Sequence, residues 1–217
     1  LEIDFIDSED ITKKSINRLK KLQGIVVPGG FGNRGVEGKI LAANFARINN
    51  IPYFGICLGM QISVIEFARN ILGLKDANST EFDLKTPFPV ISLVTEWDDY
   101  KKGKLKGSLH QMGGTMRLGA QSCTLMKKTL AHSLYKKNII SERHRHRYEV
   151  NNKFVDQFNE TDLVFSGYSG NKDLMEMLEL KHHPWYLASQ FHPEFTSSPL
   201  KGHPLFNSFI KTAYETK

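Results

Sequence analysis

The stretch GICLGM at residues 55–60 decides the fold, because it joins a predicted strand directly to a predicted helix. Residues 51–56 form a short apolar run of strand length, and residues 60–72 repeat apolar side chains at helical spacing. Glycines two positions before and after Cys57 let the chain turn sharply, while the cysteine side chain projects outward. This pattern is typical of a nucleophile elbow.

The segments around this stretch repeat the alternation of strand and helix. Residues 24–27 form a buried strand that runs into PGGFG at 28–32, and residues 37–49 have helical apolar spacing. Strand, helix, strand and helix with short links predict an α/β protein with a mostly parallel central sheet flanked by helices. Further strands are expected at 143–150, 163–168, 174–181 and 185–191, with a closing helix at 205–214.

The remaining segments carry weaker signals. Residues 1–6 alternate apolar and polar side chains, and residues 15–22 resemble the end of a helix. Strands are also expected at 90–95 and 115–118, within a part of the chain rich in Ser, Thr, Gly and Pro. The basic, glycine-punctuated residues 101–106 predict a surface hairpin or a mobile loop.

Length and composition describe an ordinary globular protein. The chain has 217 residues, 40% hydrophobic and 24% charged, without a repeat or a linker, so one domain over residues 1–217 is expected. Its longest apolar runs are far shorter than the roughly 20 residues of a membrane-spanning helix. The N-terminal residues lack the pattern of a secretion signal. We therefore expect a cytoplasmic protein with no membrane partner.

Charge and cysteine content exclude few classes of function, but they limit the chemistry that the side chains could perform. A net charge of +6 favours anionic partners without establishing nucleic-acid binding. The two cysteines, Cys57 and Cys123, have no short metal-type spacing, which argues against a disulfide framework and against a metal site. We interpret Cys123 as a small strand residue. Cys57 remains as a candidate nucleophile, because the N-terminus of the following helix favours thiolate over thiol.

A cysteine nucleophile needs a base, and the base needs an orienting acid. The segment QFHPEF at 190–195 supplies both in His192 and Glu194, because in an extended chain residues i and i+2 point to the same side. The other histidines that we considered lack such a neighbour and are interpreted as surface or core residues: His110, His132, His182, His183 and His203.

The order of the candidate catalytic residues along the chain, and the glycine-rich segment, indicate which class of reaction to expect. An α/β-hydrolase elbow is followed by the acid and then the histidine, whereas here His192 precedes Glu194, which argues against an esterase. The glycines of PGGFG and the N–H of Leu58 could form an oxyanion hole for an attacked carbonyl group. A phosphate-binding loop is disfavoured, because the spacing of such loops and their Gly-Lys-Ser/Thr ending do not occur.

These motifs resemble a known family. GICLGMQ, QFHPEF and PGGFG are similar to the class I (triad) glutamine amidotransferases, which have a flavodoxin-like architecture. The wider motifs narrow the resemblance to the glutaminase domains of the CTP synthase family. They are PGGFGNRGVEGK (28–39), GICLGMQ (55–61), ANSTEF (77–82), GGTMRLGAQ (113–121), RHRHRYEVNN (143–152) and QFHPEFTSSP (190–199).

The resemblance implies a role for each matching residue. Cys57 would be the nucleophile, His192 the general base and acid, and Glu194 its orienting partner. Glutamine would be bound by a set of positions in the same motifs: Gly30, Leu58, Gly59, Met60, Gln61, Glu81 and Arg147. Alternation should place Arg143, Arg145 and Arg147 on one face of a strand, and His144, His146 and Tyr148 on the other.

The resemblance also implies the reaction and its partners. Glutamine would be hydrolysed through a γ-glutamyl thioester, and the ammonia would reach a synthetase domain that converts UTP to CTP with ATP and Mg²⁺. GTP would be an allosteric activator, and the full-length enzyme would be a tetramer. The domain itself would need no cofactor, and no nucleic acid would be a partner. Arg117 is a candidate contact for the activator or for a partner domain.

The sequence departs from the family in two respects and leaves two alternatives. The chain lacks a synthetase portion, and it starts late, so the first strand and helix of the family's domain are expected to be missing. One alternative is a stand-alone γ-glutamyl cysteine hydrolase, which would act without nucleotide dependence. The other is a non-catalytic assembly module that uses the basic strip and residues 101–106 to bind a partner.

Overall fold

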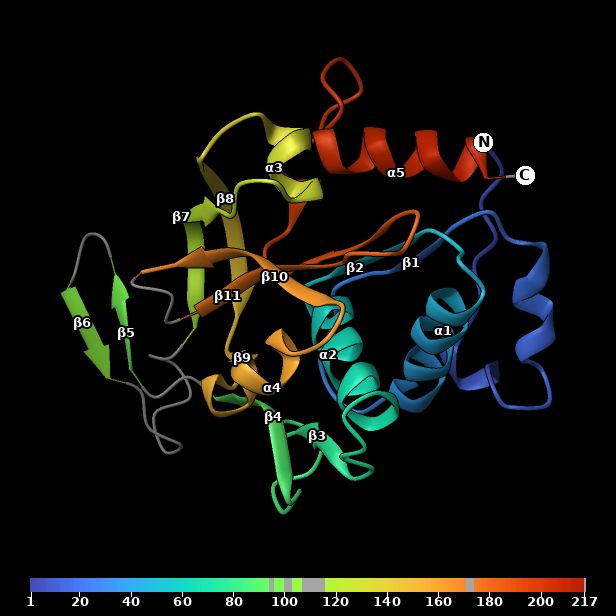
Figure 1. Ribbon diagram of the computed structural model, residues 1–217, viewed down its shortest axis with the longest axis horizontal. Coiled ribbons are helices and arrows are strands. Elements are labelled where there is room, and N and C mark those ends of the chain that lie inside the picture. Colours follow the sequence, from blue (N-terminus) through green and yellow to red (C-terminus); the bar gives the residue numbers. More distant parts are fainter. Residues whose placement is uncertain (94–95, 100–102, 107–115, 171–173, 217) are drawn as a thin grey trace.

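The structure is a computed structural model that describes residues 1–93, 96–99, 103–106, 116–170 and 174–216. Its centre is a seven-stranded sheet with the strand order β1-β2-β12-β11-β10-β7-β8 (Figure 1). These strands are β1 (Ile25–Val27), β2 (Tyr53–Ile56), β7 (Arg117–Leu125), β8 (Ile139–His146), β10 (Leu163–Ser169), β11 (Leu174–Leu180) and β12 (Tyr186–Ser189). A second sheet contains β3 (Ala77–Ser79), β4 (Phe88–Leu93) and β9 (Tyr148–Val150), and a hairpin contains β5 (Glu96–Asp99) and β6 (Gly103–Lys106).

The α-helices lie on both faces of the seven-stranded sheet (Figure 1). They are α1 (Val36–Ile48), α2 (Leu58–Asn70), α3 (Leu130–Tyr135), α4 (Val155–Asn159) and α5 (Pro204–Glu215). Short 3₁₀ turns occur at η1 (Ser8–Asp10), η2 (Ile16–Lys21), η3 (Asn152–Phe154) and η4 (Pro193–Phe195). None of the helices in the described part of the chain is long and apolar enough to cross a membrane.

The predicted α/β class is confirmed, but the sheet is mixed rather than mostly parallel. β1, β2 and β12 are parallel neighbours, whereas β12–β11, β11–β10, β10–β7 and β7–β8 are all antiparallel. Parallel neighbours need a crossover connection, which α1 provides between β1 and β2. β10, β11 and β12 follow one another through short links, and antiparallel neighbours such as these need no crossover helix. The repeating strand–helix pattern is therefore confined to the first third of the chain.

Each face of the sheet has its own apolar cluster. α1 and α2 cover one face with residues such as Ile40, Phe45 and Ile65, all nearly inaccessible to water. α3 and α5 cover the opposite face, where Leu205 and Phe209 of α5 are buried. Successive residues of a strand point to opposite faces. In β2, Tyr53 accordingly belongs to the first cluster and Phe54 to the second.

Several predicted elements differ in detail from the structure. Residues 1–6 form no strand, and the alternating apolar side chains Leu1, Ile3 and Phe5 are exposed. The predicted strand at 143–150 is divided, because Arg147 lies at a bend between β8 and β9. Residues 15–22 contain the 3₁₀ turn η2 rather than an α-helix. The hairpin expected at 101–106 is present as β5 and β6, although residues 100–102 lie outside the described part of the chain.

Arg117 is a core residue rather than the surface contact that the sequence suggested. Only 2% of its surface is exposed. Its guanidinium donates to Glu149 Oε1 at 2.8 Å and to Glu176 Oε1 at 2.7 Å, and both carboxylates are buried. A surface role in activator or partner binding is therefore wrong, because the charge is already paired inside the protein.

Replacing Arg117 with methionine should destabilise the fold strongly, because the buried side chains of Glu149 and Glu176 would both lose the guanidinium that donates to them. We expect the free energy of unfolding to fall by about 3–5 kcal/mol. Urea unfolding followed by circular dichroism measures this change. Arg143→Met removes an exposed arginine from β8 and should change the same quantity by less than about 0.5 kcal/mol. Equal effects of the two substitutions would contradict the assignment of Arg117.

Candidate active site

Cys57 lies at a sharp turn between β2 and α2, as the elbow pattern predicts. Its backbone has φ 52° and ψ −100°, a conformation that residues with side chains rarely adopt. Close packing around the turn leaves space only for glycine on either side. A Cβ atom on Gly55 would lie 2.6 Å from the carbonyl oxygen of Gly59, and one on Gly59 would collide with the carbonyl oxygen of Val27. The backbone of β1 therefore fixes where α2 starts.

The Cys57 thiol is buried, with 2% of the residue exposed. Burial raises the pKa of this thiol to about 12. The backbone N–H of Leu58 donates to the sulfur and lowers the pKa, but its effect is smaller than that of burial. The carboxylates of Glu149, Glu194 and Glu81 raise the pKa as well. We expected the helix N-terminus to favour thiolate, but burial outweighs this effect. The thiol therefore keeps its proton until another group removes it.

His192 and Glu194 make the predicted contact. His192 Nδ1 lies 2.7 Å from Glu194 Oε1, and the ring also stacks on Phe195 with 4.9 Å between the ring centroids. The backbone N–H of His192 donates to the carbonyl oxygen of Arg143 in β8, which ties this segment to the sheet. The buried Nε2 atom has no hydrogen-bond partner among the described residues. The carboxylate thus holds one ring nitrogen and leaves the other available.

Gly29 brings the cysteine and the histidine together. β1 pairs with β2 in parallel, as expected, so the PGGFG loop that follows β1 lies beside the elbow. A Cβ atom on Gly29 would lie 2.9 Å from His192 Cε1 and 3.6 Å from Cys57 Cβ. Gly29 therefore lies next to both the imidazole of His192 and the Cβ atom of Cys57, and a side chain at this position would crowd the imidazole.

The rest of the glycine loop lies against the start of α2. A Cβ atom on Gly30 would lie 3.2 Å from Leu58 Cδ2, so the two proposed oxyanion-hole residues are neighbours. The N–H of Gly32 donates to Glu81 Oε1 at 2.8 Å. Glu81 follows β3, so this hydrogen bond brings the ANSTEF motif to the same loop.

Three further residues predicted to bind glutamine differ in their burial and in their hydrogen bonds. Gln61 is buried and donates from Nε2 to the Tyr148 carbonyl oxygen at 3.0 Å. Arg147 is half-buried, and its Nε atom has no hydrogen-bond partner among the described residues. The Met60 side chain is fully buried in the core, and its N–H donates to the carbonyl oxygen of Cys57. The Met60 side chain belongs to the apolar cluster that α1 and α2 cover.

The predicted alternation is confirmed for residues 143–146 only, because β8 ends at His146. Arg147 lies at the bend and Tyr148 begins β9, and both are half-buried. Arg143 and Arg145 are exposed, and the Arg145 guanidinium lies 6.0 Å from the centroid of the Phe31 ring. His144 and His146 point inward and contact each other, with 2.8 Å between His144 Nδ1 and His146 Nε2. Burial holds the pKa of both histidines well below its usual range, so both are neutral at physiological pH.

Sequence reasoning missed two parts of the site. Gln190 is completely buried, and its Nε2 atom lies 3.7 Å from Cys57 Sγ. Its position two residues before His192 was the available signal. Glu149 is the second part: burial raises its carboxyl pKa to about 8, with Arg117 lowering the pKa and Glu176 raising it. Nothing in the local sequence marks Glu149 as a buried acid.

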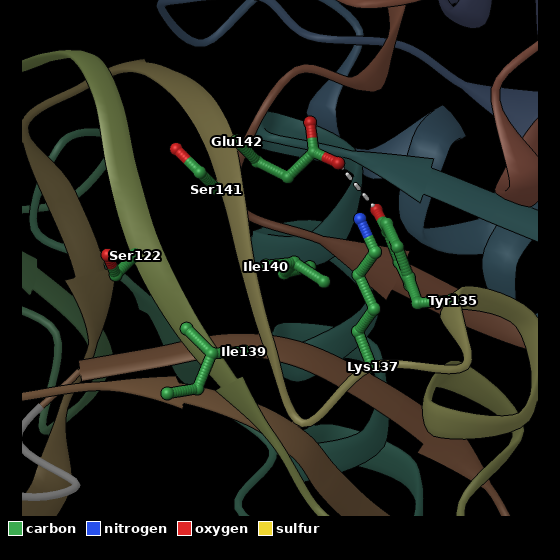
Figure 2. A pocket seen from close by; sticks show the side chains of 7 residues that line it. All are labelled: Ser122, Tyr135, Lys137, Ile139, Ile140, Ser141 and Glu142. Carbon is green, nitrogen blue, oxygen red and sulfur yellow. Dashed lines mark hydrogen bonds between the residues drawn. The ribbon is translucent and has the colours of Figure 1, made fainter.

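A surface pocket of about 360 Å³ lies beside β8 and contains none of the predicted site residues (Figure 2). Its Glu142 carboxylate accepts from Tyr135 at 2.9 Å, the contact drawn in Figure 2, and is 2.9 Å from His203 Nε2. The second oxygen of Glu142 accepts from Thr196 at 3.1 Å. Thr196 directly follows η4, so this carboxylate anchors the turn that carries Glu194.

The remaining histidines in the described part of the chain add nothing to the site. His203 caps the N-terminus of α5, and His183 Nε2 lies 3.2 Å from the Ala46 carbonyl oxygen. His110 lies outside the described residues. Within the described ranges, no group of three or more His, Cys, Asp or Glu side chains could hold a metal ion.

The elbow, the oriented histidine and the glycine loop together are the features of a cysteine-dependent acyl-transfer site. The model of the family Glutamine amidotransferase class-I matches residues 1–212. The chain belongs to the class-I glutamine amidotransferases and is an enzyme. The family resemblance inferred from the motifs is therefore confirmed.

Solved structures extend this comparison. One is the glutaminase domain of CTP synthase from Trypanosoma brucei, solved with bound acivicin, which is 39% identical to this chain. The TM-score is 0.89, and the match covers 100% of this chain and 82% of that chain. A putative GMP synthase protein from Thermoplasma acidophilum is 19% identical (TM-score 0.56, coverage 97% and 78%). A glutamine amidotransferase from Thermotoga maritima is 12% identical (TM-score 0.50, coverage 81% and 58%). The last two show a shared fold only.

Replacing Gly29 with alanine should impair turnover without unfolding the chain. The new methyl group would lie 2.9 Å from His192 Cε1, so the imidazole would have to shift from its position. Because a misplacement of about 1 Å costs about 10²-fold in rate, we expect kcat for glutamine hydrolysis to fall about 100-fold. Steady-state kinetics measures this loss, and thermal unfolding serves as the control. A kcat within threefold of wild type would contradict the proposed packing.

The buried Glu149 carboxyl should give stability a measurable pH dependence. Its pKa is raised from an ordinary 4.5 to about 8 in the folded chain. Its contribution to stability is therefore complete below about pH 4.5 and is lost as pH rises through about 8.

Glu149→Gln should remove this dependence. The difference between the free energies of unfolding of wild type and variant should shrink in favour of the variant as pH rises from 5 to 8. The expected slope is at most about 1.4 kcal/mol per pH unit. Urea unfolding at several pH values tests this, with the exposed Glu160→Gln as the control. Parallel curves for wild type and Glu149→Gln would show that the carboxyl has an ordinary pKa.

Proposed function

We propose that this chain hydrolyses the side-chain amide of glutamine through Cys57, His192 and Glu194, with a γ-glutamyl thioester as the intermediate. The observation that carries the proposal is that the Glu194-oriented imidazole and the elbow cysteine both lie next to Gly29. Membership of the class-I glutamine amidotransferases supports glutamine as the substrate.

In the first step, Cys57 Sγ attacks the amide carbon of glutamine while His192 Nε2 takes the thiol proton. Negative charge develops on the carbonyl oxygen, and the N–H groups of Leu58 and Gly30 are placed to stabilise it. His192 then passes the proton to the leaving nitrogen, the carbon–nitrogen bond breaks, and ammonia departs. Glu194 stabilises the imidazolium that forms between these events.

In the second step, water hydrolyses the thioester. His192 takes a proton from the water as the oxygen attacks the same carbon, and the carbon–sulfur bond breaks. Glutamate leaves, and the proton returns to Cys57. The raised pKa of the buried thiol fits this cycle, because sulfur is protonated at its start and end.

Recognition of the amino-acid end of glutamine follows from charge. Its ammonium group needs an anion, and Glu81 is held next to the glycine loop. Its carboxylate needs a donor, and Arg147 has a buried Nε atom without a hydrogen-bond partner among the described residues. We assign these two residues to the ends of the substrate, with the backbone of residues 58–60 lining the space between.

We further propose that the ammonia supplies a synthetase domain that converts UTP to CTP with ATP and Mg²⁺. The similarity to the CTP synthase glutaminase domain of Trypanosoma brucei supports this coupling. In this proposal GTP activates glutamine hydrolysis, the full-length enzyme is a cytoplasmic tetramer, and this domain itself needs no cofactor.

Glutamate release from glutamine by the purified chain, with and without GTP, tests the proposal. Cys57→Ala should lower the rate by at least about 10³-fold, because it removes the nucleophile. Cys123→Ala is the matched control, since the second cysteine is buried in β7, and should retain activity within threefold. Stimulation by GTP would favour the CTP synthase reaction, and a fast rate that ignores GTP would favour a stand-alone hydrolase.

Labelling by acivicin, a glutamine analogue, provides a second measurement that does not require turnover. Mass spectrometry should find the adduct on Cys57 and none on Cys123. Activity that survives Cys57→Ala, or labelling of Cys123 alone, would contradict the mechanism. An unlabelled, inactive but folded chain would favour a non-catalytic assembly module.

A further inference from the structure

Gln190 contacts the sulfur of the nucleophile from inside the protein. It follows β12 directly, is fully buried, and its backbone N–H donates to the Glu176 carbonyl oxygen at 2.8 Å. Its side-chain Nε2 lies 3.7 Å from Cys57 Sγ, and its Oε1 accepts from Gln61 Nε2 at 3.3 Å. One amide therefore joins the nucleophile to a predicted glutamine-binding residue.

The hydrogen-bond network determines which end of this amide faces the sulfur. The Tyr148 carbonyl oxygen can only accept, so the Gln61 atom 3.0 Å away from it must be the NH₂ nitrogen. That same nitrogen contacts Gln190, so the Gln190 atom that it meets must be the oxygen. The Gln190 NH₂ group is therefore the end that points to Cys57.

An N–H donor at this place matters because the thiolate has little other support. The sulfur is buried, and the nearby carboxylates disfavour negative charge on it. Apart from the Leu58 N–H, the donor that reaches the sulfur in the described structure is Gln190. A hydrogen bond to a charged group is stronger than one to a neutral group, so this contact gains strength as the thiol loses its proton.

We propose that Gln190 stabilises the Cys57 thiolate during attack, and that Gln61 is a positioning residue that holds the Gln190 amide in the required orientation. This inference rests on the proposed role of Cys57 as nucleophile. It gives the residue two positions before the histidine a role distinct from those of His192 and Glu194. It also gives Gln61 a role through Gln190, since the Gln61 NH₂ group is engaged by the Tyr148 carbonyl oxygen and by Gln190.

The test measures the reactivity of the Cys57 thiol rather than turnover, so it does not depend on the identity of the substrate. The probe is iodoacetamide at pH 8, with the rate of Cys57 alkylation followed by mass spectrometry. Gln190→Glu keeps the shape and the oxygen that accepts from Gln61, but places a carboxylate oxygen beside the sulfur. Gln190→Met removes the donor at similar length.

We expect both variants to alkylate about 10- to 100-fold more slowly than wild type, which corresponds to the loss of one hydrogen bond to a charged group. The kcat for glutamine hydrolysis should fall by a similar factor. KM should change less in Gln190→Glu than in Gln190→Met, because only the first retains the acceptor for Gln61. Thermal unfolding verifies that each variant is folded.

Alkylation within twofold of wild type in folded Gln190→Glu and Gln190→Met would overturn the proposal. If neither variant folds, Gln61→Met carries the test, because it releases the Gln190 amide without replacing it. Cys57 alkylation should then fall about threefold or more, and an unchanged rate would overturn the proposal. Failure of the triad itself would be distinguishable, since it would leave Cys57→Ala active whatever the Gln190 variants do.

Discussion

The close contact between the backbones of β1 and α2 is the constraint on which the rest of the site depends. Gly59 can approach the Val27 carbonyl oxygen only because it has no side chain. That approach brings the PGGFG loop beside Cys57 and forces the strained backbone of the elbow. The strained turn lies between a strand and a helix that are both buried, so the surrounding scaffold maintains the position of the Cys57 side chain.

A second constraint is electrostatic and comes from charged and polar side chains in the protein interior. One arginine, two carboxyl groups and two neutral histidines are buried together in the core, and the arginine donates to both carboxyl groups. Such a group is expensive to bury and does not by itself stabilise a fold relative to apolar packing. It does fix the relative positions of β7, β8, β9 and β11, because each contributes a member. The segments that carry Arg147 and His192 are attached to these strands.

The success of sequence-based prediction depended on the distance between interacting residues. The elbow, and the contact between His192 and Glu194, are local patterns and were predicted correctly. Arg117 was misplaced because its partners are 32 and 59 positions away, and the Gln190 contact with Cys57 spans 133 positions. The antiparallel half of the sheet was missed for a related reason. Apolar runs identify strands, but their direction is decided by the connections between them.

Because β2 packs in both apolar clusters, it affects how the native chain can unfold locally. Tyr53 packs in the apolar cluster on one face of the sheet and Phe54 in the cluster on the other. The strand that leads to Cys57 thus packs in both apolar clusters, and neither cluster can loosen while the other keeps that strand in place. Partial openings of the native chain should therefore begin at peripheral segments such as residues 1–6. The amide protons of β2 should be among the last to exchange with solvent.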